Sequence, residues 1–355
     1  MRKRALNTFI MILALSSLAT AQSSVVRPDT YTLLTMPYNQ RPLTLYKGQL
    51  QVNAGYKFSV MARQFNSDGQ IEILRDLGIA SVYHYYFGEL KYGVTSFLEL
   101  SAQTNYMKRG VRSQTVTYVS ANETIKVNSL TEEKGLGDLL VIASLRLPFE
   151  FRVADLGISG GLFIPSAEHE PQQPTHNVSN VLSESAYTIN YQYHNKIGEG
   201  VPVYFISARV KATLSGFSLE ASFTLRDPLR EGENIRWDQS ITENRSFDYA
   251  ATNYKYLPDR TYDISTAFHY QAAGWLNAAV NLNYIRSEAG WTEYWEKKYR
   301  NPEKSMLAIE PGLEIQVSPA ITIYQKAGFP VSGKNMHAPF YMYITASFNR
   351  FPFFR

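Results

Sequence analysis

The sequence predicts an all-β fold: a transmembrane antiparallel up-and-down β-barrel of about twelve strands, with short periplasmic turns and long extracellular loops. Three observations lead to this prediction: an N-terminal export signal, stretches in which apolar and polar residues alternate, and connections that are alternately short and long. Composition agrees, because 14% of the 355 residues are aromatic and only 19% are charged. Many aromatic and few charged residues suit strands with one face toward lipid and one face toward water.

Charge and cysteine content exclude several classes of protein. The 35 Lys and Arg residues against 31 Asp and Glu residues give a formal net charge of +4, too balanced to indicate a nucleic-acid-binding protein. The chain has no Cys. Thiolate metal sites, cysteine nucleophiles and disulfide scaffolds are therefore excluded.

The first 21 residues predict a cleaved secretory signal peptide. Basic residues at Arg2–Arg4 precede an apolar stretch at Phe9–Leu18, and Ala19–Ala21 supplies a cleavage site with small residues. The alternative, a membrane anchor helix, needs roughly 20 apolar residues, about twice this stretch. We therefore expect an exported protein, located in the bacterial outer membrane if its strands cross a bilayer.

Alternation of period two recurs along the chain and predicts the strands. Between Gln49 and Arg63, every second residue from Leu50 to Ala62 is apolar, and Met61 is the one apolar residue on the polar face. Most predicted strands are long enough for a tilted strand to cross a bilayer, which takes roughly 9–11 residues. The predicted strands are 49–63, 78–93, 97–108, 136–147, 155–165, 201–214, 217–227, 261–272, 275–287, 305–317, 321–329 and 340–351.

The connections between these strands alternate in length without exception. With a periplasmic N-terminus, every short turn falls on the periplasmic side and every long polar loop outside, as in bacterial outer-membrane barrels. A secreted β-sandwich also alternates, but it predicts shorter strands and no such rhythm. Closure explains how the strands can span, because a ring leaves no unpaired backbone edge in hydrocarbon. The long loops are 64–77, 109–135, 166–200, 228–260, 288–304 and 330–339.

The predicted organisation has three parts: a signal peptide at 1–21, an N-terminal periplasmic extension or plug at 22–47, and the barrel at 48–355. Residues 22–47 contain three prolines and no sustained periodicity. A segment tucked into the barrel and a mobile extension fit this pattern equally well. The aromatic-rich last strand, 340–351, resembles the assembly signal read by the outer-membrane insertion machinery, although the tail Pro352–Arg355 departs from its usual ending.

Charged residues on the polar faces are predicted to line the lumen, because Arg or Lys at the midplane of the lipid face costs about 2–4 kcal/mol. A barrel of eight strands is filled by side chains and one of sixteen is open, so twelve strands suggest a narrow or plugged path. For any single charge the plainer alternative is structural, an ion pair with a neighbour. The candidates are Lys57, Arg63, Lys91, Glu99, Asp138, Arg146, Arg209, Lys211, Glu220, Arg226, His269, Glu310 and Glu314, with Glu89, Asp263 and Lys326 on the same faces.

Turn geometry predicts two ion pairs among these candidates. A two-residue loop at 215–216 places Lys211 opposite Glu220. A turn in which Gly93 opposes Phe97 places Lys91 opposite Glu99.

The sequence predicts no catalytic residues, no metal site and no cofactor. It contains no nucleophile elbow, zinc-protease motif or phosphate-binding loop. His169, His176 and His194 share one loop but are spaced too loosely for a zinc motif. A lipid-modifying enzyme of the outer membrane is therefore a distant third hypothesis.

Two blocks resemble a known group of outer-membrane proteins. Lys91–Leu100 reads KYGVTSFLEL and Lys134–Asp138 reads KGLGD. These blocks are similar to the pattern of the phenol-degradation meta-pathway family of transporter-like barrels, over roughly residues 85–147. The resemblance implies a barrel that passes or binds small compounds, with aromatic or hydrophobic compounds as the expected candidates.

The expected function is therefore passive transport of a small solute through the barrel, and the sequence does not identify that solute. The alternative is a surface interaction protein whose barrel anchors the loop Pro228–Arg260, where Trp237, Tyr249, Tyr254 and Tyr256 offer a contact surface. Expected partners are outer-membrane lipids and the insertion machinery, and no nucleic acid.

Overall fold

A computed structural model describes most of the predicted barrel and the last residues, 41–47, of the predicted N-terminal extension. The described residues are 41–74, 81–120, 123–147, 154–167, 187–191, 200–241, 247–288, 290–294 and 297–350. The predicted signal peptide and residues 22–40 lie outside this part of the chain. Within the described residues there is no helix of the length and apolarity needed to cross a membrane.

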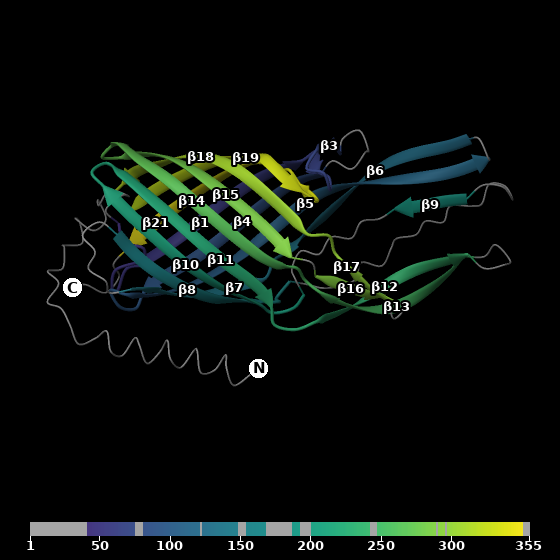
Figure 1. Cartoon of the computed structure of the whole chain (residues 1–355), viewed down its shortest axis with the longest axis horizontal. Helices are drawn as coiled ribbons and strands as arrows, with labels where there is room; N and C mark the ends of the chain where they lie inside the picture. The colour runs from purple at the N-terminus through teal and green to yellow at the C-terminus, as the bar shows by residue number, and fades with distance from the viewer. Residues whose placement is uncertain are drawn as a thin grey trace.

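Twelve antiparallel strands close into a barrel whose strands are visibly tilted (Figure 1). Each strand pairs with the next one along the chain, and the last, β21, pairs with the first, β1. All twelve predicted strands and the predicted fold class are thus confirmed. The strands are β1 (Leu50–Met61), β4 (Ser81–Gly93), β5 (Leu98–Ser120), β7 (Leu139–Arg146), β8 (Ala154–Ile164), β10 (Val203–Leu214), β11 (Phe217–Pro228), β14 (Arg260–Ala273), β15 (Leu276–Glu288), β18 (Lys304–Ser318), β19 (Ile321–Lys334) and β21 (Phe340–Arg350).

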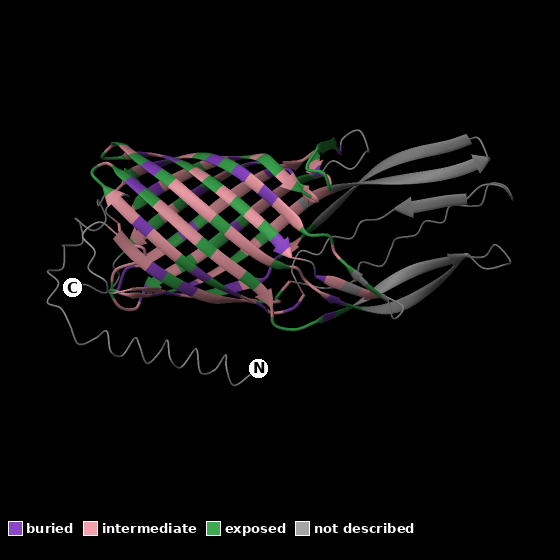
Figure 2. Ribbon diagram, viewed as in Figure 1, coloured by how far each residue is buried: buried purple, intermediate pink, exposed green. Residues whose placement is uncertain are grey.

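The outer face of the barrel is apolar and exposed. Phe268, Met342 and Trp275 leave 55%, 56% and 58% of their surface uncovered. Figure 2 shows that exposed and less exposed residues alternate along the barrel strands. So large an apolar surface is rare on a soluble monomer but suits contact with lipid acyl chains.

The two hairpin registers give one confirmed and one wrong prediction. Lys211 pairs with Glu220 as expected, with 3.4 Å between Lys211 Nζ and Glu220 Oε1. The second register is shifted, because Gly93 opposes Glu99 and Lys91 opposes Ser101. The cause is a longer turn, in which the Thr95 hydroxyl oxygen accepts the backbone N–H groups of residues 97 and 98 at 3.1 and 2.9 Å.

The long loops contain strands that the alternation did not predict. A pattern of period two detects strands with one apolar face, and these strands lack a lipid-facing side. Pairs β5–β6 and β12–β13 extend well beyond the barrel (Figure 1). The additional strands are β2 (Arg63–Phe65), β3 (Ile71–Ile73), β6 (Glu123–Leu136), β9 (Tyr187–Tyr191), β12 (Gly232–Ile241), β13 (Phe247–Leu257), β16 (Trp291–Tyr294), β17 (Lys297–Arg300) and β20 (Met336–His337).

Small apolar clusters attach these extracellular elements to the barrel. Phe65 on β2 packs with Met306 on β18 and with Ala338, and all three are buried. On another side, Val201 and Val203 pack against Tyr256. Burial of a large apolar side chain contributes about 1.5–3 kcal/mol. These contacts therefore hold β2 and the end of β13 against the barrel rim.

Candidate functional site

The lumen is the candidate site, and the alternation of the strands determines which side chains reach it. Residues that alternate with the exposed apolar positions point inward, and many of them are buried and polar. Lys211, Glu310 and Glu314 leave only 4%, 3% and 8% of their surface exposed. Buried charges require partners. At the periplasmic end, several of these partners come from the segment before β1.

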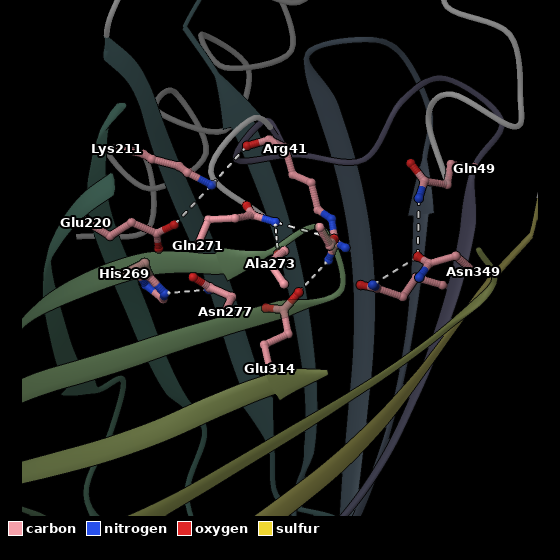
Figure 3. Close-up of polar contacts among 12 residues, drawn as sticks. Arg41, Gln49, Lys211, Glu220, His269, Gln271, Ala273, Asn277, Glu314 and Asn349 are labelled. Carbon is pink, nitrogen blue, oxygen red and sulfur yellow. Dashed lines mark hydrogen bonds and ion pairs between the residues drawn. The ribbon is translucent and has the colours of Figure 1, made fainter. Parts of the chain in front are cut away.

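Residues 41–49, which we call the N-terminal strap, bind the inside of the wall near the short turns. Arg41 Nη1 donates a hydrogen bond to Glu314 Oε1 on β18 at 2.9 Å. From the other side, Lys211 Nζ on β10 donates to the Arg41 carbonyl oxygen at 3.1 Å. Figure 3 shows both contacts beside the Lys211–Glu220 ion pair.

Two further carboxylates hold the backbone of the strap. The Leu43 N–H donates to Asp155 Oδ2 on β8 at 2.9 Å. The Leu45 N–H donates to Glu99 Oε2 on β5, also at 2.9 Å. Hydrogen bonds to charged acceptors are about twice as strong as neutral ones. Glu99 is thus occupied by the strap, which agrees with its lack of pairing with Lys91.

The strap therefore runs across the inside of the barrel at its periplasmic end. Its successive partners lie on β18, β10, β8 and β5, and it then continues into β1. Gly93 at the end of β4 accommodates the passage, because a Cβ atom there would overlap the Tyr46 carbonyl oxygen. The Gly48 N–H then donates to the Gly93 carbonyl oxygen at 2.7 Å, which fixes the start of β1.

A cavity of about 340 Å³ lies along one side of the inner wall, and one of its lining residues, Glu314, is the residue that binds Arg41 of the strap. This volume lies at the small end of the range for ligand sites in proteins. Its lining combines both signs of charge with hydroxyl and amide groups. The lining residues are Arg209, Val210, Glu220, Ala221, Ser222, Ser265, Ala267, His269, Asn281, Glu314 and Tyr324.

Among the described residues, the buried atoms of this lining that have no hydrogen-bond partner include Arg209 Nε and Asn281 Oδ1. The other ends of both side chains are held. Arg209 Nη2 donates to Ser159 Oγ at 3.3 Å, and Asn281 Nδ2 donates to the Tyr324 hydroxyl at 3.4 Å. A buried donor and a buried acceptor without partners favour water or a polar solute in the cavity.

Nearer the extracellular end, a second charge cluster and a tyrosine ring line the inner wall. Lys326 Nζ donates to Glu310 Oε2 at 2.7 Å, and the Tyr341 hydroxyl donates to the other oxygen of the same carboxylate. Lys57 Nζ lies 4.3 Å from the centre of the Tyr341 ring, a favourable cation–π distance. These contacts join β1, β18, β19 and β21 across the inner wall.

The remaining predicted lumen residues are placed as follows. Arg146 pairs with Asp155 at 2.6 Å, and Lys91 pairs with Glu89 on its own strand at 3.3 Å. Arg226 lies 5.6 Å from the Phe163 ring centre.

Two predicted lumen residues lie outside the barrel strands. Asp138 is buried between β6 and β7, where its carboxylate accepts the backbone N–H of Ala167 at 3.3 Å. Arg63 is exposed on β2, in the three-stranded extracellular sheet and not in the barrel wall. The chain leaves the barrel at the end of β1, two residues earlier than the alternation suggested.

Sequence reasoning missed the neutral half of the site and the strap. Asn281, Tyr324 and Tyr341 occupy the same inward positions of the alternation, but they lack the charge that indicated the predicted lumen residues. Arg41 lies in a segment without periodicity, so no pattern indicated its contact with Glu314. Among the described residues, no group of three His, Cys, Asp or Glu side chains is arranged to hold a metal ion.

Comparisons with known proteins identify the fold. No family model and no curated protein matches the sequence. An outer membrane channel from Pseudomonas putida F1 shares the architecture with a TM-score of 0.58 at 12% identity, over 86% of this chain and 97% of that chain. The NanC porin gives a TM-score of 0.40 at 9% identity, over 84% of this chain and 98% of that chain. The KdgM porin gives a TM-score of 0.37 at 9% identity, over 83% and 98%. The chain has the closed, twelve-stranded antiparallel barrel fold of the outer membrane channel from Pseudomonas putida F1.

Proposed function

We propose that the protein is a passive channel for small solutes, closed at its periplasmic end by the N-terminal strap. The observation that supports this proposal most directly is a polar cavity of about 340 Å³ inside a closed barrel, whose lining residue Glu314 also binds Arg41 of the strap. The strap crosses the lumen at the periplasmic end, so its departure should widen the path past this cavity. Four charged side chains of the wall bind Arg41, Leu43 and Leu45 of the strap.

The lining supports a small solute that carries polar groups. Tyr324 offers an aromatic face, while Arg209, Ser222 and Ser265 offer hydrogen bonds from the surrounding wall. The resemblance to phenol-degradation barrels suggests aromatic compounds. Hydroxylated or carboxylated aromatics satisfy both requirements, and we propose this class over purely hydrophobic compounds, which leave the polar lining without partners.

Uptake into proteoliposomes tests the solute class. Labelled 4-hydroxybenzoate is a suitable probe, because its charge slows direct passage through lipid, and a pentose of similar size serves as the comparison. We expect faster entry of 4-hydroxybenzoate than in protein-free liposomes. Equal entry of both solutes with and without protein contradicts channel function.

Planar-bilayer conductance tests the strap. Arg41→Gln removes the charged contact with Glu314 and should increase the fraction of time in which the channel conducts. Lys47→Gln is the matched control, because Lys47 is an exposed cation of the same segment. If both variants conduct like the wild-type protein, the strap does not close the channel.

The extended extracellular hairpins support the alternative function, a surface interaction protein. β12, β13, β16 and β17 form a four-stranded sheet outside the barrel. Trp237, Tyr249 and Tyr254 of the proposed contact surface have side chains outside the described set, while Tyr256 is buried against the barrel rim. Removal of residues 234–254 should abolish partner binding and leave conductance intact if this alternative is correct.

A further inference from the structure

A lysine on the inner face of β1 lies between two tyrosines of the neighbouring strands. Lys57 is directly opposite Tyr85 on β4 and directly opposite Tyr343 on β21. Residues opposed on one face of a sheet have their Cβ atoms only about 4.5–5.5 Å apart. Met342 and Ile344, which flank Tyr343 along its strand, are exposed on the lipid-facing surface, so this row points into the lumen.

The ammonium group of Lys57 has no carboxylate partner. Its Nζ atom lies over the face of the Tyr341 ring, and within the described residues this lysine forms no hydrogen bond or ion pair. The residues beside it on the inner face, at positions 55, 59, 85 and 343, carry no charge. The side chain is only half-buried. Lys57 therefore presents an ammonium group that an anion in the lumen can contact.

The Tyr341 ring holds this ammonium group on the lumen side of the wall. Gly328 on β19 lies directly beneath the ring, because a Cβ atom there would overlap it. The Tyr341 hydroxyl donates to the Glu310 carboxylate, which fixes the ring in this position. Since one face of the ring covers Gly328, the ammonium group of Lys57 occupies the other face, at a distance favourable for a cation–π contact.

Other charged groups nearby balance one another and leave Lys57 unpaired. Lys57 interacts electrostatically with Lys326 and Glu310. These two groups form their own ion pair at 2.7 Å. Asp263 on β14 interacts electrostatically with Arg226 on β11 and with the same ion pair. Two cations and two carboxylates thus surround this part of the lumen, and Lys57 adds one further positive charge.

A chain of aromatic rings leads from Lys57 to the cavity. The rings of Tyr343 and Phe87 are nearly parallel, with 5.3 Å between their centres. On its other side, the Tyr343 ring lies 6.4 Å from the ring of Tyr324. Both separations are within the range of favourable aromatic pairs, about 4.5–7 Å. Tyr324 lines the cavity described above, so ring contacts connect the two positions along the inner wall.

We propose that Lys57, Tyr85 and Tyr343 form a second binding subsite, which holds aromatic carboxylates before they reach the cavity. The carboxylate accepts a hydrogen bond from Lys57 Nζ, and the aromatic ring of the solute packs against the two half-buried tyrosine rings. Small-molecule sites commonly combine aromatic side chains with a few polar groups in this way. The inference rests on the proposed channel function and assigns a further position to the same solute class.

Equilibrium dialysis of radiolabelled benzoate against the purified full-length protein in detergent tests the proposal. Lys57→Met keeps the length of the side chain and removes its charge. This variant should bind one benzoate fewer per barrel than the wild-type protein, whether or not the cavity binds another. Lys57→Arg should bind like the wild-type protein, which separates loss of charge from a folding defect. Lys91→Met is the matched control, because it removes an inward lysine that is already paired with Glu89 at 3.3 Å, and it should change nothing.

Competitors that lack one feature of the ligand complete the test. Benzamide has the ring without the charge, and acetate has the charge without the ring. Neither should displace benzoate from the Lys57-dependent site at a concentration at which unlabelled 4-hydroxybenzoate does. The proposal is overturned if Lys57→Met binds as many benzoate molecules as the wild-type protein, if the wild-type protein binds none, or if benzamide competes as well as 4-hydroxybenzoate.

The binding measurement requires no transport, so its outcome is separate from that of the uptake experiments. Benzoate binding that depends on Lys57, combined with no uptake into proteoliposomes, contradicts the channel function and leaves the subsite intact. Uptake of 4-hydroxybenzoate without any binding that depends on Lys57 contradicts the subsite alone.

Discussion

A reversible disulfide between the strap and the wall should lock the channel shut. Leu43 on the strap lies beside Gly157 on β8, and a Cβ atom built on Gly157 is 3.8 Å from the Leu43 Cβ atom. This separation equals the mean Cβ–Cβ distance of natural disulfides, about 3.8 Å. The chain has no Cys of its own. The double variant Leu43→Cys/Gly157→Cys therefore contains a single possible bridge.

The expected change in channel opening follows from the free energy of the contacts that hold the strap. A hydrogen bond to a charged group contributes about 1.5–3 kcal/mol, and Arg41–Glu314 is such a contact. Its loss in Arg41→Gln should raise the ratio of open to closed channels by a factor of roughly ten or more. The disulfide acts in the opposite direction, because a covalent bond prevents the strap from leaving at position 43.

The assay is planar-bilayer conductance of one protein preparation before and after reduction. The oxidised double variant should show little conductance, and dithiothreitol should restore the conductance of the wild-type protein. Adding Arg41→Gln to the double variant should increase conductance only after reduction. Single Cys variants control for the substitutions themselves. If the oxidised and reduced proteins conduct equally while mass spectrometry confirms the bridge, the strap does not close the pathway.

Three further predictions concern individual side chains. Arg209→Gln should slow 4-hydroxybenzoate uptake several-fold and leave pentose uptake unchanged, because only the carboxylate uses the guanidinium group. Gly93→Ala should increase conductance, since its methyl group displaces the Tyr46 carbonyl oxygen from the strap path at a cost of about 1–3 kcal/mol. Burial alone raises the pKa of Asp259 in the extracellular loop, but hydrogen bonds from Asn301, Lys304 and a backbone N–H outweigh it, so the pKa is lowered overall. Because this pKa is lowered, Asp259 contributes its full stabilisation of the loop above about pH 4, and that stabilisation is lost as the pH falls through the folded-state pKa. Hydrogen exchange of residues 290–304 should therefore accelerate only below about pH 4. The variant Asp259→Asn should accelerate the exchange already at pH 7.

The barrel could be predicted from the sequence because lipid and water impose opposite requirements on alternate residues. Phe217–Arg226 shows the pattern without interruption, and β11 begins at the same Phe217. The register of Lys211 and Glu220 followed from the two-residue turn alone. The hairpin β12–β13 could not be predicted in this way, because water on both sides removes the contrast between faces.

The strap contacts were beyond sequence reasoning for a different reason. Arg41 and Glu314 are 273 residues apart, and nothing local requires them to meet. The wrong pairing of Glu99 with Lys91 has a local cause, the longer turn at Thr95. The partner that Glu99 does have is a backbone N–H of Leu45, 54 residues away, and no local pattern indicates a backbone donor at that distance.

The carboxylates at the periplasmic end explain why the wall and the strap depend on each other. Glu99, Asp155 and Glu314 all point into the lumen close to the short turns, and each accepts a hydrogen bond from the strap. Asp155 also has a cation of the wall, Arg146, whereas Glu314 receives its closest cation from the strap itself. Departure of the strap thus exposes acceptors that water must then solvate, and this exchange costs less than burying them without donors. A wall with acidic acceptors at this end is therefore stable both with the strap bound and with the strap released. An apolar binding surface for the strap would be exposed to water on release and would not be stable in both arrangements.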